Sequence, residues 1–204
     1  MNIHSLVVAK SETQPRIEDK REAIMQAALE LFAEQGFYGT AVPEIAERAK
    51  VAAGTIYRHF ESKEALVNAL YARYKAQLGA CLISEFPFSL PPRQQFHHFF
   101  AKALEFARKE PLAFKFLEGH HHGAYLDDAS KALEERVLQP AYAFFEQTAR
   151  LKITKHAPAE ALGALIWGSI VGVVRATWEK RLKLDSKVEA VVEEAIWDAV
   201  RRHD

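Results

Sequence analysis

The sequence predicts an all-α protein of about nine helices. Apolar residues recur at helical spacing, as in the stripe Ile24, Ala27, Ala28 and Leu31. Two very short helical segments, joined by a tight turn, lie between longer ones in residues 36–66. A proline-rich break at residues 84–92 then separates this region from a further series of helices. These observations indicate a small N-terminal helical unit followed by a larger helical domain.

The composition limits the class of protein. The chain has 204 residues, 49% of them hydrophobic, which is enough for a packed core. Lys plus Arg and Asp plus Glu both number 27, so the formal net charge is zero and bulk charge does not indicate a partner. The single cysteine, Cys81, is expected to be a small core residue in a reducing, cytoplasmic setting.

No membrane association is expected from the apolar segments. The N-terminal run over residues 6–9 is short and has no basic segment before it, which argues against a signal peptide. The longest run, residues 161–174, is too short to span a bilayer. Residues 1–17 form a polar stretch that predicts a flexible arm, with a DNA-contacting basic arm as the alternative.

The N-terminal unit has clear start and stop signals. A first helix is predicted over residues 18–35, with Gly36 ending it. Thr40 is expected to cap a second helix over 42–49, and Ser62 to cap the fourth. Between them, a third helix over 53–60 would bury Ile56 and Phe60. This is the spacing of a helix-turn-helix, whose second helix enters the DNA major groove.

The remaining positions of the third helix suit a groove. Small residues allow close approach, hydroxyls and cations can contact phosphates, and arginine or histidine can also donate to base edges. The predicted DNA-binding residues are Thr40, Lys50, Ala53, Gly54, Thr55, Tyr57, Arg58, His59 and Lys63.

This stretch resembles the N-terminal domain of the tetracycline-repressor (TetR) family of transcriptional regulators. The resemblance covers about residues 18–75 and is carried by Gly36-Phe37, Thr40, Ile45-Ala46, Val51, Gly54-Thr55-Ile56-Tyr57, His59-Phe60 and Lys63. The sequence departs from the family pattern at Lys50, often Gly, and at Ala52, often Ser. Lys50 would then adopt a left-handed conformation, and Ala52 would leave the third helix without a side-chain cap.

The second domain is predicted to hold an apolar cavity. Helices are expected over residues 62–83, 93–109, 111–119 and 127–152, with Pro140 kinking the last of these beside aromatic residues. Such a kink either opens a cavity or is filled by side chains. The predicted ligand-binding residues are Phe96, Phe100, Phe114, Leu117, His121, Tyr125, Tyr142, Phe145, Trp167 and Arg175.

The last two helices predict a dimer. The helix over residues 158–182 is apolar almost all round and so should be buried on every face. Ser186 and Glu189 form a capping box for the final helix. Two such helices pair well with their copies as a four-helix interface, as the family resemblance also implies, although they could instead close the protomer's own core. The predicted dimerisation residues are Leu165, Ile166, Val173, Trp178, Val192 and Ile196.

No cofactor, metal or catalytic site is expected. Three consecutive histidines, His120 to His122, point about 100° apart on a helix and cannot converge on one ion. The sequence has no Gly-rich phosphate loop and no Gly-x-Ser-x-Gly, His-Glu-x-x-His or paired-carboxylate motif.

The sequence therefore predicts a cytoplasmic, homodimeric, ligand-responsive repressor that binds palindromic double-stranded DNA and is released by a small apolar or amphipathic molecule. The expected units are a flexible arm (1–17), a helix-turn-helix domain (18–65) and a ligand-binding and dimerisation domain (66–204). Two alternatives remain: a related protein that acts through protein contacts without DNA, and an all-α enzyme that uses the aromatic pocket.

Overall fold

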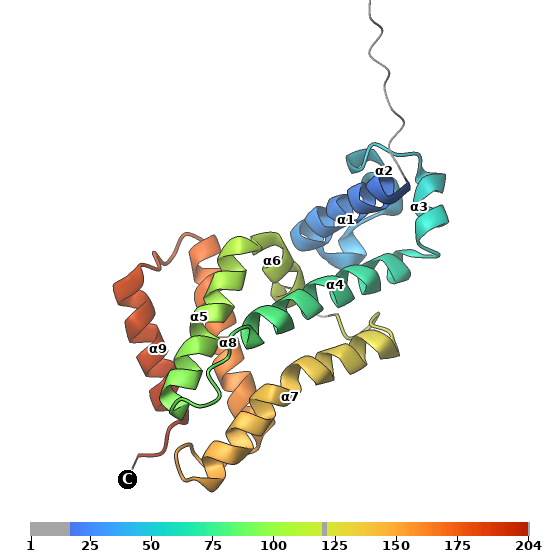
Figure 1. Cartoon of the computed structure of the whole chain (residues 1–204). Helices are drawn as coiled ribbons and strands as arrows, with labels where there is room; N and C mark the ends of the chain where they lie inside the picture. Colours follow the sequence, from blue (N-terminus) through green and yellow to red (C-terminus); the bar gives the residue numbers. More distant parts are fainter. Residues whose placement is uncertain (1–16, 120–121, 204) are drawn as a thin grey trace, which may run out of the picture.

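The computed structural model describes residues 17–119 and 122–203, and these residues form nine α-helices (Figure 1). The predicted arm and the first two histidines of the His120–His122 tract lie outside the described residues. The helices are α1 (Ile17–Gly39), α2 (Val42–Arg48), α3 (Ala53–His59), α4 (Lys63–Ile83), α5 (Pro92–Lys109), α6 (Pro111–Gly119), α7 (Asp128–Arg150), α8 (Ala159–Trp178) and α9 (Ser186–Val200).

Helices α1 to α3 pack into a head at one end of the molecule (Figure 1). Ile24, Phe32, Ile45 and Ile56 are fully buried between them. At Gly36 the backbone turns to φ 73°, a left-handed conformation in which glycine carries no steric penalty, so the regular helix stops where the sequence predicts.

The cap of α2 differs from the prediction. Thr40 is 2% exposed and its hydroxyl donates to the Gly36 carbonyl at 2.8 Å. The N-cap residue is Ala41, whose backbone N–H donates to a Glu44 carboxylate oxygen at 3.0 Å. Thr40 therefore closes the end of α1 instead of starting α2.

The turn between α2 and α3 is as predicted. Lys50 has φ 55°, the left-handed conformation expected of a residue at a glycine position. Ala52 is the N-cap of α3 and makes no side-chain capping bond. Both features leave α3 held mainly by burial of its apolar face.

Helix α4 joins the head to the body of the molecule (Figure 1). Its stripe Leu66, Leu70, Tyr74 and Leu78 is buried, and the Ser62 hydroxyl caps it by accepting from the Ala65 N–H at 3.1 Å. Helix α4 runs without a break through residues 65 and 66, so the predicted domain boundary falls inside one continuous helix.

The body consists of α5 to α9 around the second half of α4. Helices α5 and α6 are separated at Glu110, as the sequence predicts. Helix α7 continues through Pro140 and passes close to α4, where a Cβ on Gly79 would lie 2.9 Å from a Val137 methyl group.

Helix α8 is not buried on every face, which corrects the prediction. Within the protomer it buries one stripe, Leu162, Ile166, Ile170 and Val174, and ends at Trp178, four residues early. The opposite stripe is exposed and consists of Ala161, Ala164, Leu165, Gly168, Gly172 and Arg175. By length and composition α8 could cross a membrane, and 22% of its apolar window is buried. Burial inside one protomer therefore does not account for its composition.

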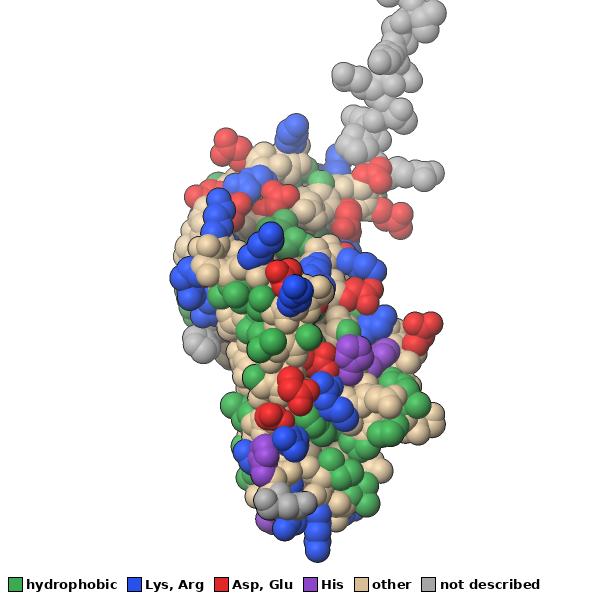
Figure 2. All heavy atoms as spheres, turned by 90° about the vertical axis from the view of Figure 1, so that its left-hand side faces the viewer, with side chains coloured by type: hydrophobic (Ala, Val, Ile, Leu, Met, Phe, Trp, Pro, Cys, Tyr) green, Lys and Arg blue, Asp and Glu red, His purple; other side chains and the backbone are tan. Residues whose placement is uncertain are grey.

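Helix α9 also leaves apolar residues uncovered. Its N-cap is Asp185, whose carboxylate accepts from the N–H groups of Lys187 and Val188 at 3.0 Å, so the predicted Ser186 capping box is wrong. Val191 is exposed, as are Ala195 and Ala199. Figure 2 views the molecule from the side that carries α9 and shows hydrophobic side chains between charged ones on this surface.

Candidate functional site

Helix α3 presents one face to solvent. Ala53, Gly54 and Arg58 are exposed, His59 is half-buried, and the Tyr57 side chain is 56% exposed. A methyl group on Gly54 would meet no atom within 4 Å. The first turn of α3 is therefore open and nearly flat, bounded by a tyrosine and an arginine, which is a shape that permits close approach to a base-pair edge.

Two threonines predicted to contact DNA do not lie on this surface. Thr55 is 7% exposed and its hydroxyl accepts from Nη2 of Arg58 at 3.2 Å. The Thr40 side chain is buried under the end of α1. Both hydroxyls already have partners inside the head, so in this conformation neither side chain can reach a phosphate.

Lys63 holds the head together. Its ammonium group donates to the carbonyls of Phe37 and Thr40 at 2.9 and 3.0 Å, and lies 4.1 Å from the centre of the Phe37 ring. Two of its three N–H donors thus fix the end of α1 to the start of α4. Its replacement would disturb the fold of the head as well as any phosphate contact.

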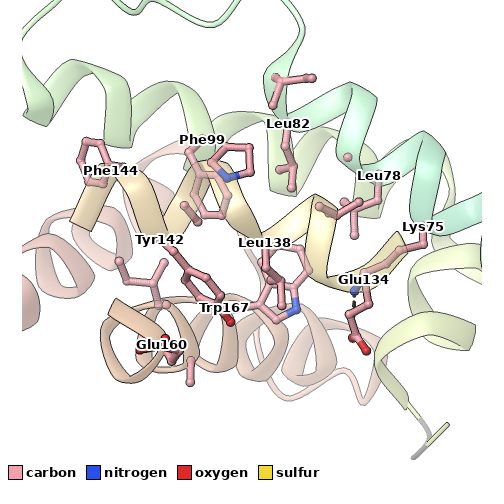
Figure 3. Close-up of a pocket in the computed structure, with 18 of the residues that line it drawn as sticks. Lys75, Leu78, Leu82, Phe99, Glu134, Leu138, Tyr142, Phe144, Glu160 and Trp167 are labelled. Atoms are coloured by element: carbon pink, nitrogen blue, oxygen red, sulfur yellow. Dashed lines mark hydrogen bonds and ion pairs between the residues drawn. The ribbon is translucent and has the colours of Figure 1, made fainter. Parts of the chain in front are cut away.

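The body encloses a pocket of about 610 Å³ between α4, α5, α6, α7 and α8. Its volume is within the range of small-molecule sites, roughly 300–1,000 Å³. Figure 3 shows Leu78, Leu82, Phe99, Leu138, Tyr142 and Trp167 around it. Most of the wall is apolar, and its side chains come from all five of these helices.

Charged groups gather at one end of the pocket. The ammonium group of Lys75, on α4, lies 3.4 Å from a carboxylate oxygen of Glu134, on α7 (Figure 3). The indole N–H of Trp167, on α8, donates to Glu118 of α6 at 2.8 Å. Burial raises the pKa of the Glu118 carboxyl, against the attraction of Lys75 and the hydrogen bond from Trp167. Burial, with Glu134 beside it, also raises the pKa of the Tyr71 hydroxyl.

The segment between α6 and α7 connects this pocket to the head. His122, on the pocket wall, is buried, and its Nε2 donates to the Phe116 carbonyl at 2.7 Å. The Asn68 side chain of α4 donates to the Tyr125 carbonyl at 2.8 Å and accepts from the Asp127 N–H at 2.9 Å. The segment from His122 to Asp127 is thus tied to the same helix that carries the head.

Two family models match the chain. The model described as bacterial regulatory proteins, tetR family, matches residues 24–70, and the tetracyclin repressor-like C-terminal domain matches residues 71–202. The second match alone covers more than half of the chain. The chain belongs to the TetR family. Because this is a family of regulatory proteins, the alternative of an all-α enzyme is set aside.

Individual relatives of this TetR-family protein match less than half of the chain. An HTH-type transcriptional repressor of Mycobacterium tuberculosis is 40% identical over 81 residues, which is 40% of this chain and 43% of the relative. The HTH-type transcriptional repressor DhaR of a Mycobacterium species is 31% identical over 86 residues, 42% of this chain and 43% of the relative. The chain therefore matches less than half the length of these relatives.

Solved structures match the fold over nearly the whole chain. A TetR-family protein from Vibrio parahaemolyticus superposes with a TM-score of 0.74 at 24% identity, covering 90% of this chain and 99% of that one. A TetR-family transcription regulator from Marinobacter aquaeolei gives a TM-score of 0.75 at 22% identity, covering 91% and 97%. At these identities the likeness establishes the architecture alone.

The pocket of this TetR-family protein contains half of the predicted ligand-binding residues. Phe96, Leu117, Tyr142, Phe145 and Trp167 line it, and their role in binding stays a prediction. Phe100 and Phe114 pack into the core, Arg175 lies on the exposed stripe of α8, and Tyr125 stacks on Phe37 of the head. His121 lies outside the described residues.

The predicted dimer residues also divide into two groups. Leu165 is 46% exposed, and Val173, Trp178 and Val192 are half-buried, so they remain available to a second copy. Ile166 and Ile196 are buried inside the protomer, which corrects their assignment. Both point to the opposite side of their helices, where they form part of the core.

Sequence reasoning overlooked the charged end of the pocket. A signal for it exists, because Tyr71, Lys75, Leu78 and Leu82 fall at i, i+4, i+7 and i+11 on α4, so that a lysine interrupts an apolar stripe. No comparable pattern in the sequence indicates that Glu118 and Glu134 lie beside Lys75. Among the described residues no group of three His, Cys, Asp or Glu side chains is placed to hold a metal ion.

Proposed function

We propose that this protein is a homodimeric transcriptional repressor that acts in the cytoplasm. It binds operator DNA through the exposed face of α3 and leaves the DNA when a small apolar or amphipathic molecule enters the pocket. The observation that supports it best is the open surface formed by Ala53, Gly54, Tyr57 and Arg58 on the second helix of a helix-turn-helix. Relatives described as HTH-type transcriptional repressors also support the proposal.

Dimerisation is part of the proposal because one head offers few charges to DNA. Lys50 and Arg58 are exposed, but Arg48 lies 3.3 Å from Glu30 and 3.7 Å from Glu34. Few phosphate contacts mean low affinity for a single head, so two heads on one molecule are needed. Each would contact one half of a pseudo-palindromic site, with half-sites spaced by about 34–36 Å or a multiple of it.

The exposed apolar stripes of α8 and α9 are the proposed dimer surface. Leu165 and Val191 are large apolar residues left open there, and the small residues Gly168 and Gly172 allow a second helix to approach closely. Leu165→Glu should shift the protein to a monomer in size-exclusion chromatography with light scattering. Leu151→Glu, at a residue 59% exposed at the end of α7, is the matched control and should leave the dimer intact.

Ligand response would follow from linkage between the two sites. A molecule that binds the pocket better when the heads are wrongly spaced lowers the affinity for DNA, and DNA lowers the affinity for that molecule by the same factor. Helix α4 is the proposed connection because it contributes to both the head and the pocket wall.

Selection from random DNA by the purified protein tests the proposal. We expect an enriched palindrome, and Tyr57→Ala should weaken its binding at least tenfold in gel shifts while the melting temperature is unchanged. Leu151→Ala, a truncation of a similarly exposed side chain outside the head, should bind normally. If no palindrome is enriched, the alternative of a protein that acts through protein contacts replaces the repressor proposal.

A further inference from the structure

A buried lysine marks one end of the pocket. Lys75 is 7% exposed, and its ammonium group lies 5.7 Å from the centre of the Tyr71 ring. An ammonium group has three N–H donors. Among the residues that the structure describes, this group has one hydrogen-bond partner, the Glu134 carboxylate, at the long distance of 3.4 Å. Lys75 therefore retains the capacity to bind another acceptor on the pocket side.

The two members of this ion pair differ in burial. The side chain of Lys75 is 8% exposed, whereas that of Glu134 is 42% exposed. A buried charge that loses its partner is destabilising, so Lys75 favours an anion beside it. Glu134 can instead turn its carboxylate into water, giving up its long contact with Lys75 and its interaction with the Tyr71 hydroxyl. Another carboxylate can thus replace that of Glu134 while Lys75 stays in place.

The space beside the pair is apolar. Figure 3 shows Leu78, Leu138 and Trp167 next to Lys75, with Phe99 and Tyr142 further along the pocket. This arrangement has one polar end and a long hydrophobic remainder, which matches a molecule with one polar group and an apolar body.

We propose that the pocket binds an amphipathic carboxylate, whose carboxylate group replaces that of Glu134 on Lys75 and whose apolar body lies along Leu78, Phe99 and Leu138. This inference rests on the proposed function in taking the pocket as a ligand site. The exchange of one carboxylate for another leaves the net charge around Lys75 unchanged. It also places the ligand's charge in a charge-assisted hydrogen bond shielded from water.

An organic cation is the competing ligand class, because Glu118 and Glu134 are both near this end. Three observations favour the carboxylate. Glu118 already accepts the Trp167 indole N–H at 2.8 Å. Glu134 is the more exposed partner of its pair. An amine placed between them would also put a second positive charge beside the buried ammonium of Lys75.

Calorimetric titration of the purified full chain tests this inference without DNA. The probes are dodecanoate, dodecanol and dodecylamine, all below their micelle concentrations, with octanoate and hexadecanoate to vary the length. We expect dodecanoate to bind at least about tenfold more tightly than dodecanol, and Lys75→Met to abolish that preference. Lys115→Met, a lysine of α6 outside the pocket lining, is the matched control and should keep it.

The affinity of the Glu134→Gln variant for dodecanoate is an independent test, because this substitution leaves the buried Lys75 in place. Because it frees Lys75 from its competitor, dodecanoate should bind several-fold more tightly. A cation site would instead lose affinity. Preference for dodecylamine, equal binding of all three probes, no binding of any carboxylate, or weaker carboxylate binding by Glu134→Gln would each overturn the inference.

Gel shifts with the selected operator separate this inference from the proposed function. Carboxylate binding without release of DNA would contradict the proposed ligand response and leave the pocket chemistry standing. If a different class of molecule releases the DNA and no carboxylate binds, the proposed ligand response stands and the carboxylate inference is overturned.

Discussion

The hydroxyl group of Tyr125 donates a 2.8 Å hydrogen bond to Nδ1 of His122. Nε2 of His122 donates to the Phe116 carbonyl, which leaves Nδ1, the other ring nitrogen, facing the Tyr125 hydroxyl. On its other side the Tyr125 ring stacks on Phe37 of the head, with 4.2 Å between ring centres. One side chain therefore contacts a residue of the pocket wall and the end of α1, and burial raises the pKa of its hydroxyl to about 12.

Tyr125→Phe should remove the hydrogen bond to His122 and keep the stacking on Phe37. The ring can still stack on Phe37, but the 2.8 Å hydrogen bond to Nδ1 of His122 is lost. We expect the free energy of unfolding to fall by about 1 kcal/mol, the typical net contribution of one intramolecular hydrogen bond. Chemical denaturation measures it. Tyr38→Phe, at a tyrosine that is 77% exposed, is the control, and an equal loss in both variants would contradict the assigned role of the hydrogen bond.

Asn68→Ala should weaken the attachment of the segment from His122 to Asp127 to helix α4. It removes the donor to the Tyr125 carbonyl and the acceptor for the Asp127 N–H, so two backbone groups lose their partners. We expect a loss of about 2–3 kcal/mol in the free energy of unfolding. Asn68→Asp keeps the acceptor but not the donor, and its loss should be smaller. If Asn68→Asp is the more damaging, charge and not hydrogen bonding decides the effect.

The helices could be predicted because their signals are local. Gly36, Ser62 and the Glu110-Pro111 break act on the backbone next to them, and each ends or starts a helix where predicted. The end of α8 was missed because Lys180, a non-glycine residue with φ 57°, terminates it while the Arg181 N–H donates back to the Ala176 carbonyl. Nothing in the sequence indicates this conformation at Lys180, whereas Lys50 stands where the family pattern often has glycine.

The pocket was predicted less well because it depends on contacts between helices. A stripe shows which face of a helix is buried but not which neighbour covers it. Phe114 and Trp167 have the same apolar character, yet the former lies in the core and the latter lines the pocket. The partners of Lys75 come from α6 and α7, at sequence separations of 43 and 59 residues, and no local pattern predicts such a pairing.

Ala52→Ser should stabilise the head. Ala52 has the extended conformation of an N-cap, with φ −68° and ψ 143°, but offers no side-chain acceptor to α3. A serine there should raise the free energy of unfolding by about 1 kcal/mol. Ala49→Ser is the control because Ala49 is the C-cap of α2, where a serine has no free N–H to accept from. Equal effects of the two substitutions would refute the capping explanation.

Glu118→Gln should stabilise the protein at neutral pH and not in acid. The pKa of the Glu118 carboxyl is raised in the folded state, chiefly by burial, so folding disfavours its charged form despite Lys75. A group with a raised pKa contributes most to stability below its unfolded value, near 4.5, and loses that contribution as the pH rises through the folded value.

The neutral glutamine avoids this loss while its amide oxygen can still accept from the Trp167 indole N–H. As the pH rises from about 4.5 through the folded-state pKa of Glu118, the variant should therefore become more stable than the parent, and the difference should disappear in acid. Thermal unfolding at a series of pH values measures the difference, with Glu146→Gln, at an exposed residue paired with Arg150, as the control. A variant that is less stable than the parent at neutral pH would show that attraction by Lys75 outweighs burial, and that Glu118 is charged in the folded protein.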